Sequence, residues 1–167
     1  MQSTTQLKYE KTARKDPRMW ILFLFGFTFM LAAFQVNPAE NCTESGECAP
    51  WLVPAARALG FILAAAGAGQ LLANPSRGSH IDPESGDLVW WQNRFGNSGG
   101  NEGRLHPSQI GRLRLFRQSE GEDLVSLYDL SDERQPFFDG EVLPRPYDKW
   151  VHAFAEKWPH IKVEIID

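Results

Sequence analysis

Two features of this sequence contain residue types that could take part in chemistry: a glycine-rich segment and four histidines. The segment GNSGGNEGR, residues 96–104, could present backbone N–H groups to a phosphate. A Walker phosphate loop ends in Gly-Lys followed by Ser or Thr, which this segment lacks, and its glycines also miss the G-x-G-x-x-G spacing. We therefore expect a hairpin loop over residues 94–103, with phosphate binding as the alternative.

The four histidines form no recognisable metal or acid–base motif. His80 and Asp82 are two positions apart, a spacing found among metal ligands, but they lie in a connecting segment that suits a preformed site poorly. No HExxH, HxH or Cys/His cluster is present. The sequence therefore predicts no catalytic residue, no metal and no cofactor, and a protein that is not an enzyme.

The two cysteines, Cys42 and Cys48, are six positions apart and enclose the flexible stretch TESGE. In an oxidising compartment such a pair is expected to form a disulfide. Two free thiols and a two-ligand metal site are the alternatives.

Arg112 and Arg114 alternate with leucines in QIGRLRLFR, so they are expected to share the polar face of a half-buried strand. This basic ridge could pair with an acidic residue of a neighbouring strand, such as Asp129, or bind anionic lipid headgroups. Residues 74–167 contain 11 Lys and Arg against 16 Asp and Glu, a net charge of -5. That balance argues against a nucleic-acid partner.

Trp90 and Trp91 are adjacent in the segment DLVWWQ, so in a strand their side chains point to opposite faces. One is expected in the core. The other is either an exposed anchor for a partner protein or covered by Trp150 or Trp158.

Two long apolar segments organise the chain. Residues 19–36 carry no charge, and residues 51–73 carry only Arg57. At about 1.5 Å per residue, each is long enough for a helix across the bilayer core. We interpret both as transmembrane helices; a cleaved signal peptide and a buried soluble helix are the alternatives. Arg57 is expected to extend its side chain outward to the lipid headgroups.

The flanking charges predict the orientation of these helices. Residues 1–18 form a basic tail with five Lys and Arg, whereas the loop of residues 37–50 contains three Glu and no Lys or Arg. Segments rich in Lys and Arg next to a transmembrane helix stay on the cytoplasmic side of the membrane. We therefore expect a bacterial inner-membrane protein with a periplasmic loop and with both termini in the cytoplasm.

Small residues recur along the second apolar segment, with Gly60 and Ala64 four positions apart and Gly69 further along. Small residues let helix backbones approach closely. We expect this face to pack against the first helix; a homodimer or another membrane protein is the alternative partner.

After a linker of residues 74–86, residues 87–167 are predicted to form a small α+β domain with an antiparallel sheet. Strands are expected at 87–92, 109–117, 124–130 and 135–138, an amphipathic helix at 147–158, and a last strand or extended tail at 161–165.

Two apolar helices followed by DLVWWQ, QIGRLRLF and the late helix YDKWVHAFAEKW resemble bacterial membrane proteins with a pleckstrin-homology-like (PH-like) cytoplasmic domain. The apparent strand after the helix departs from that pattern, because a PH-like domain ends at its helix. The resemblance implies a fold and no functional residue.

These observations favour a non-enzymatic two-pass membrane protein whose cytoplasmic domain binds or positions a partner protein. An anionic-lipid sensor that uses the arginine ridge and a membrane immunity protein are the alternatives.

Overall fold

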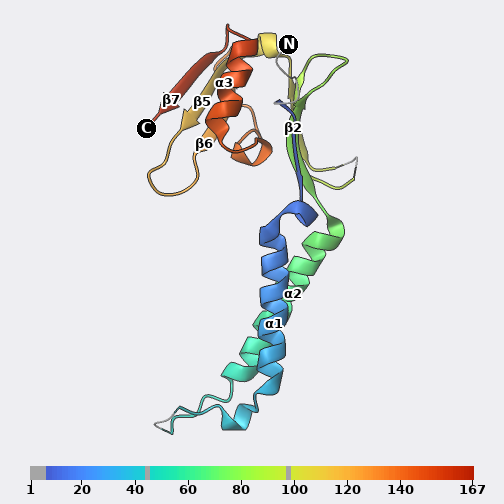
Figure 1. Ribbon diagram of the computed structural model, residues 1–167, viewed down its shortest axis with the longest axis vertical. Coiled ribbons are helices and arrows are strands. Elements are labelled where there is room, and N and C mark those ends of the chain that lie inside the picture. The colour runs from blue at the N-terminus through green and yellow to red at the C-terminus, as the bar shows by residue number, and fades with distance from the viewer. Residues whose placement is uncertain (1–6, 44–45, 97–98) are drawn as a thin grey trace. The chain divides into compact units, whose positions relative to one another are not determined.

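A computed structural model describes residues 7–43, 46–96 and 99–167 of the chain (Figure 1). The chain divides into two compact units. Thr12–Asn74 is helical, and Pro75–Asp167 forms an α/β unit together with the segment that precedes Thr12. The acidic loop residue Glu44 lies outside the described residues.

The helical unit consists of α1 (Pro17–Gln35) and α2 (Leu52–Ala73), both long and apolar enough to cross a membrane. The side chain of Asp16 caps α1 by accepting a hydrogen bond from the backbone N–H of Arg18. Asn74 ends α2 in the left-handed conformation, with φ 48°. The helix bounds lie within two residues of those expected from the sequence.

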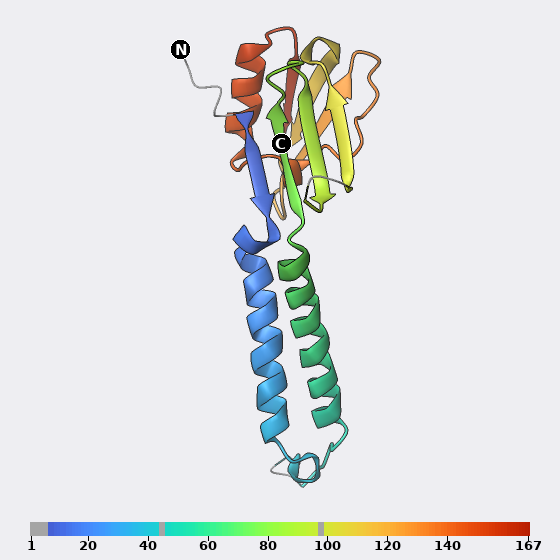
Figure 2. The same ribbon diagram turned by 90° about the vertical axis from the view of Figure 1, so that its right-hand side faces the viewer.

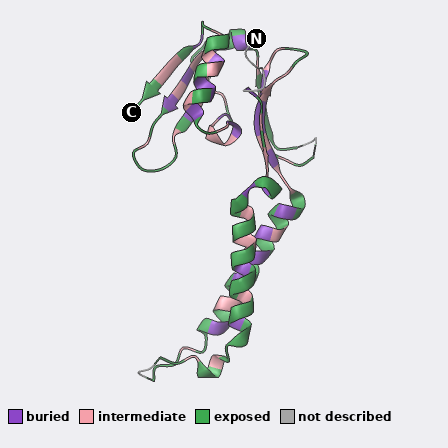
Figure 3. Cartoon of the chain, viewed as in Figure 1, coloured by how far each residue is buried: buried purple, intermediate pink, exposed green. Residues whose placement is uncertain are grey.

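Small residues form the contact between α1 and α2. A Cβ added to Gly60 would lie 2.7 Å from the backbone N of Met30, and one added to Gly67 would lie 2.7 Å from the backbone of Phe23. The two backbones therefore approach too closely for larger side chains. Most other side chains of both helices are exposed (Figure 3), and the large apolar ones include Ile21, Leu24, Phe25, Leu59, Phe61, Ile62 and Leu72.

Two arginines cap the carboxyl ends of these helices. Arg57 of α2 donates from Nε to the carbonyl of Ala33 and from Nη2 to that of Val36, each at 3.0 Å. Arg14 donates from Nε to the carbonyl of Leu71 at 2.9 Å. Each guanidinium thus satisfies carbonyls that have no partner within their own helix and lies at the negative end of the helix dipole. Arg57 does extend toward its end of the hairpin, but it reaches backbone carbonyls there.

In its described residues, the α/β unit contains two sheets and one α-helix. The first sheet has the strand order β1-β2-β3-β4, formed by Tyr9–Thr12, Ser76–Ile81, Leu88–Arg94 and Asn101–Leu105. The second has the order β6-β5-β7, formed by Leu124–Asp129, Ile110–Phe116 and Lys162–Ile166. Helix α3 spans Tyr147–Lys157.

One apolar core joins both sheets and α3. Its largest fully buried side chains include Trp90 of β3, Leu113 and Leu115 of β5, and Phe154 of α3. The inward face of α3 also contributes Trp150, whose ring stacks on Phe154 with centroids 4.8 Å apart. The helix-plus-sheet class expected from the sequence is confirmed.

The expected single antiparallel sheet is wrong in two respects. The strands form two sheets, and β7 runs parallel to β5, pairing Arg112 with Lys162 and Phe116 with Ile166. A parallel neighbour requires a crossover connection, and α3 provides it between β6 and β7. The strand expected at 135–138 is a turn: Pro136 has no N–H to donate, and Phe137 has φ 59°.

Three strands lie where the sequence predicted none. β1 lies within the basic tail, β2 within the linker of residues 74–86, and β4 within the glycine-rich segment. β2 lacks apolar alternation because its buried positions are Ser76, Gly78 and Ser79, and the buried Ser79 hydroxyl donates a hydrogen bond to the carbonyl of Val142 at 2.8 Å. Figure 2 shows β1, in blue, beside β2, in green.

Candidate functional site

The outer face of the three-stranded sheet holds the largest group of interacting polar side chains that we find in the described residues. Leu113 and Leu115 of β5 point into the core, so the residues that alternate with them point away from it. The strand register arranges this outer face in three rows: Tyr128, Arg112 and Lys162; Ser126, Arg114 and Glu164; and Leu124, Phe116 and Ile166.

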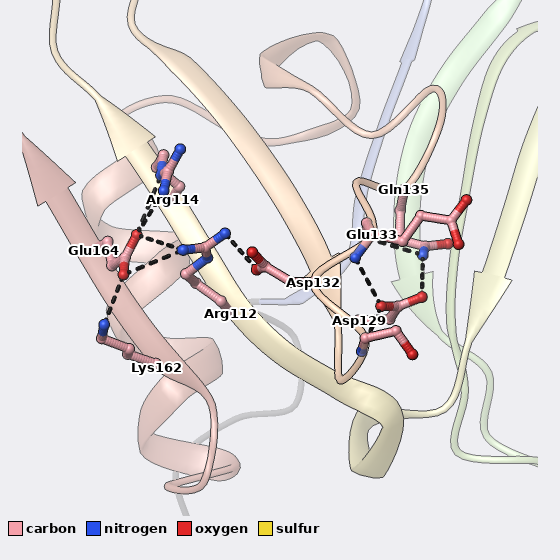
Figure 4. Close-up of polar contacts among 9 residues, drawn as sticks. Arg112, Arg114, Asp129, Asp132, Glu133, Gln135, Lys162 and Glu164 are labelled. Atoms are coloured by element: carbon pink, nitrogen blue, oxygen red, sulfur yellow. Dashed lines mark hydrogen bonds and ion pairs between the residues drawn. The ribbon is translucent and has the colours of Figure 1, made fainter.

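Glu164 is the centre of the charged part of this face (Figure 4). Its carboxylate accepts hydrogen bonds from Lys162 Nζ at 2.7 Å, from Arg114 Nη2 at 3.1 Å and from Arg112 Nη1 at 3.3 Å. The hydrogen bond from Lys162, with those from Arg114 and the positive charge of Arg112, lowers the pKa of Glu164 to about 2. The carboxylate is therefore ionised at neutral pH.

The two guanidinium groups also lie against an aromatic ring. The Tyr128 ring centroid is 4.3 Å from the Arg112 guanidinium carbon and 5.3 Å from that of Arg114. Arg112 additionally donates to Asp132 at 2.5 Å. The face thus sets three cations against two carboxylates, a local net charge of +1 in a portion of the chain with a net charge of -5.

The expected ion pair between the arginines and Asp129 does not form. Asp129 instead holds the turn after β6, where its carboxylate accepts from the backbone N–H groups of Ser131 at 2.8 Å and Glu133 at 3.0 Å, and from Gln135 Nε2 at 3.1 Å. The actual partner, Glu164, was missed because its position depends on the pairing of β7 with β5. Its alternation with Ile165 was the only signal in the sequence.

The third row of the face is apolar and exposed. Phe116 is 39% exposed, Leu124 is 52% exposed and Ile166 is 38% exposed. An apolar strip beside a charged network has the composition of a binding surface, with an apolar centre and a polar rim.

The two adjacent tryptophans are both buried, Trp90 at 1% and Trp91 at 4% exposure, so neither is available as an exposed anchor. Trp90 Nε1 donates to the carbonyl of Pro136 at 3.0 Å. Trp91 points to the opposite face of the sheet, where Arg94 lies over its ring.

The other residues singled out in the sequence lie in the helical unit. Cys42 and Cys48 lie at disulfide distance in the loop between the helices. Gly60 and Ala64 are buried against α1. Gly69 is exposed, and a Cβ added there would meet nothing within 4 Å.

Residues 101–104 of the glycine-rich segment belong to β4, which pairs with β3 in antiparallel orientation. The first residues of the segment, GNSGG, also match the G-x-S-x-G pattern of a nucleophile elbow, but that elbow connects a strand to a helix. Asn97 and Ser98 lie outside the described residues.

No group of His, Cys, Asp and Glu within residues 7–43, 46–96 and 99–167 could hold a metal ion. No protein-family model, curated protein or solved structure matches the chain.

Proposed function

We propose that the chain is a non-enzymatic two-pass protein of a bacterial inner membrane, whose cytoplasmic α/β unit binds or positions a partner protein. The observation that carries this proposal is the outer face of β6-β5-β7. There an exposed apolar row lies beside a charged network that fixes its own side chains.

The character of α1 and α2 supports insertion into a membrane. Their exposed side chains are predominantly apolar, and the charged Arg57 uses its donors on the carbonyls of Ala33 and Val36. Such a hairpin satisfies its own polar groups and exposes apolar surface, as lipid requires.

The pairing of β1 with β2 supports a shared side for the two ends of the hairpin. β1 precedes α1 and β2 follows α2, yet the two strands are neighbours in one sheet. The basic residues before α1 favour the cytoplasm for this side, and the Cys42–Cys48 pair favours an oxidising compartment for the loop.

A PH-like fold for the α/β unit remains part of the proposal. Two sheets and a late helix support it, whereas β7, which follows α3 and pairs in parallel with β5, departs from it.

The partner surface is proposed to be apolar with acidic groups beside the apolar area. The row Leu124, Phe116 and Ile166 requires an apolar complement, and the +1 charge of the neighbouring network favours a negative one. A basic partner would be repelled by the same groups.

The membrane assignment is tested by carbonate extraction and by protease treatment of spheroplasts. We expect the chain to stay with the vesicles, and Pro75–Asp167 to be protected until the membrane is opened. Release by carbonate, or loss of that segment from intact spheroplasts, would contradict the proposal.

The partner is sought with a photo-crosslinking amino acid at Phe116 in the full chain, and with the same amino acid at the exposed Glu156 of α3 as the matched control. We expect a reproducible protein adduct at Phe116 only. No adduct from Phe116, or the same adducts from both positions, would contradict partner binding by this face. A product of twice the chain mass would identify a homodimer.

The lipid-sensor alternative is tested on the full chain in nanodiscs, with and without anionic lipid. Arg112 and Arg114 are already bonded to Glu164, so a headgroup would have to displace that carboxylate. We expect crosslinking from Phe116 to be independent of anionic lipid. Adducts that require anionic lipid and are lost in Arg112→Glu/Arg114→Glu would favour the sensor.

A further inference from the structure

A cavity of about 490 Å³ opens on the outer face of the first sheet. Its walls come from β1, β2 and β3, with Lys8, Ser76, His80, Trp91 and Arg94 among the lining residues. This volume lies in the range of small-molecule sites. None of the residues of the second-sheet face lines it.

A bulge in β3 brings the side chains of Trp91 and Arg94 onto the same face of the sheet. β2 pairs Gly78 with Trp91 and Ser76 with Arg94, so β3 uses one residue more than β2 between these two pairs. The extra residue lets Asn93 adopt φ 53° and turns Arg94 to the side of Trp91. The Arg94 guanidinium carbon then lies 4.7 Å from the centroid of the Trp91 ring.

Hydrogen bonds fix the ring that forms the floor of the cavity. Trp91 Nε1 donates to Ser76 Oγ at 3.1 Å, and Ser76 Oγ in turn donates to the carbonyl of Arg94 at 3.4 Å. His80 meets the Trp91 ring edge-on, with centroids 5.5 Å apart. The floor is therefore pre-organised, which lowers the entropic cost of binding.

The charges around the cavity favour an anion. Lys8 and Arg94 line it together with one carboxylate, Glu10, while the carboxylate that pairs with Arg94, Glu102, is 64% exposed and belongs to β4. Burial lowers the pKa of His80 against the opposing charge of Asp82, and the positive charges of Lys8, Arg94 and Arg104 lower it further, so this imidazole is mainly neutral at pH 7.

Trp91 and Pro83 supply apolar surface to the lining, whereas Leu7 and Ile81 pack against the core on the other side of the sheet. We propose that this cavity binds a small organic anion, a carboxylate or phosphate attached to an apolar body. Lys8 and Arg94 would contact the anionic group, and Trp91 with Pro83 the apolar body. This site is independent of the partner-binding face, which belongs to the other sheet.

The test uses the full chain in phosphatidylcholine nanodiscs with all six tryptophans replaced by 5-fluorotryptophan. The Trp91 signal is assigned with Trp91→Phe. Fluorine NMR then follows titrations with naphthalene-2-carboxylate and phenyl phosphate, and with 2-naphthamide as the uncharged control. We expect a saturable shift of the Trp91 signal with at least one acid, with a Kd of about 1 mM for fragments of this size.

Three variants locate the anion contact. Arg94→Gln is expected to weaken acid binding about tenfold and Lys8→Gln about threefold, whereas Arg134→Gln, an exposed cation outside the cavity, should leave it unchanged. Lys8 is exposed, so its variant tests the site even where Arg94→Gln perturbs the strand.

Three results would overturn the proposal. The first is a Trp91 signal that neither acid shifts saturably up to about 10 mM, ten times the expected Kd. The second is that Arg94→Gln, Lys8→Gln and Arg134→Gln all bind the acid with equal affinity. The third is that 2-naphthamide binds as tightly as naphthalene-2-carboxylate.

Discussion

A single carboxylate, Glu164, connects three cations on the outer face of the second sheet. Folding lowers its pKa from the ordinary 4.5 to about 2. A carboxylate with a lowered pKa stabilises the fold fully above its unfolded value, and this stabilisation is lost as the pH falls from about 4.5 to about 2. We therefore expect Glu164→Gln to be less stable than the wild type at neutral pH, with the difference disappearing toward pH 2.

The measurement is urea unfolding of the full chain, followed by tryptophan fluorescence at several pH values. Glu156→Gln, at an exposed carboxylate on α3, is the control and should show no such convergence. A difference between the wild type and Glu164→Gln that stays constant from pH 7 to about pH 2 would contradict the assigned role of Glu164.

At the residue scale, the sequence located the arginine ridge but not its partner. The alternation of Arg112 and Arg114 with leucines was sufficient to place both side chains on one polar face. Asp129 was a reasonable partner by distance along the chain. Glu164 follows Arg114 by 50 residues, and no local pattern encodes a contact that depends on a crossover through α3.

At the element scale, the packing of α1 on α2 predicts that leucine at Gly60 destabilises the hairpin whereas leucine at Gly69, on the same helix, does not. Gly60→Leu would place side-chain atoms against the backbone of Met30, 2.7 Å from the new Cβ, and overpacking of this kind costs about 1–3 kcal/mol. Gly69→Leu projects into open space and should leave the hairpin intact. Unfolding of both variants by titration with SDS checks the prediction.

The same pair separates the intramolecular contact from a homodimer. If α2 instead uses its exposed small residues to meet a second copy, Gly69→Leu will reduce chemical crosslinking into dimers. Gly60→Leu would then have the weaker effect. That result would show that the essential contact of α2 is with a second copy of the chain and not with α1.

Arg57 predicts a second property of the hairpin. Arg57→Gln leaves the carbonyls of Ala33 and Val36 without their present donors, at a cost of about 1–3 kcal/mol. Arg57→Lys keeps the charge but not the two-pronged geometry and should be intermediate. Equal SDS resistance of wild type and both variants would show that water or lipid headgroups replace these bonds without loss.

Elements with a clear apolar period were predictable, and the polar strands were not. The two apolar segments, β5 and α3 lie within two residues of their expected bounds, because their buried positions recur with the period of the structure. β2 and β4 carry Ser, Gly, Asn and Glu, and these strands are held by neighbouring strands and by bonds such as Ser79 to Val142. The positions of β2 and β4 are therefore determined by tertiary contacts, which a local sequence pattern does not show.

At the scale of the whole molecule, the α/β unit is assembled from two parts of the chain, one that precedes α1 and one that follows α2. Leu7 is buried in the core, and β1 lies next to β2. Gly78 of β2 approaches β1 so closely that a Cβ there would collide with the carbonyl oxygen of Tyr9. The few residues before α1 are therefore part of the domain that follows α2.

A fragment of residues 75–167 alone should consequently be incomplete. It lacks Leu7, and removal of a buried leucine side chain costs about 2–5 kcal/mol. It also exposes an edge of β2, which favours aggregation. We expect this fragment to melt well below the same unit in the full chain, and a peptide of residues 1–16 added in trans to raise its melting temperature by adding a strand.

A Leu7→Ser peptide, which keeps the backbone pairing but loses the core contact, should raise the melting temperature only weakly. A fragment that is as stable alone as in the full chain would show that β1 is dispensable. The support that β1 gives to a common side for both ends of the hairpin would then be lost.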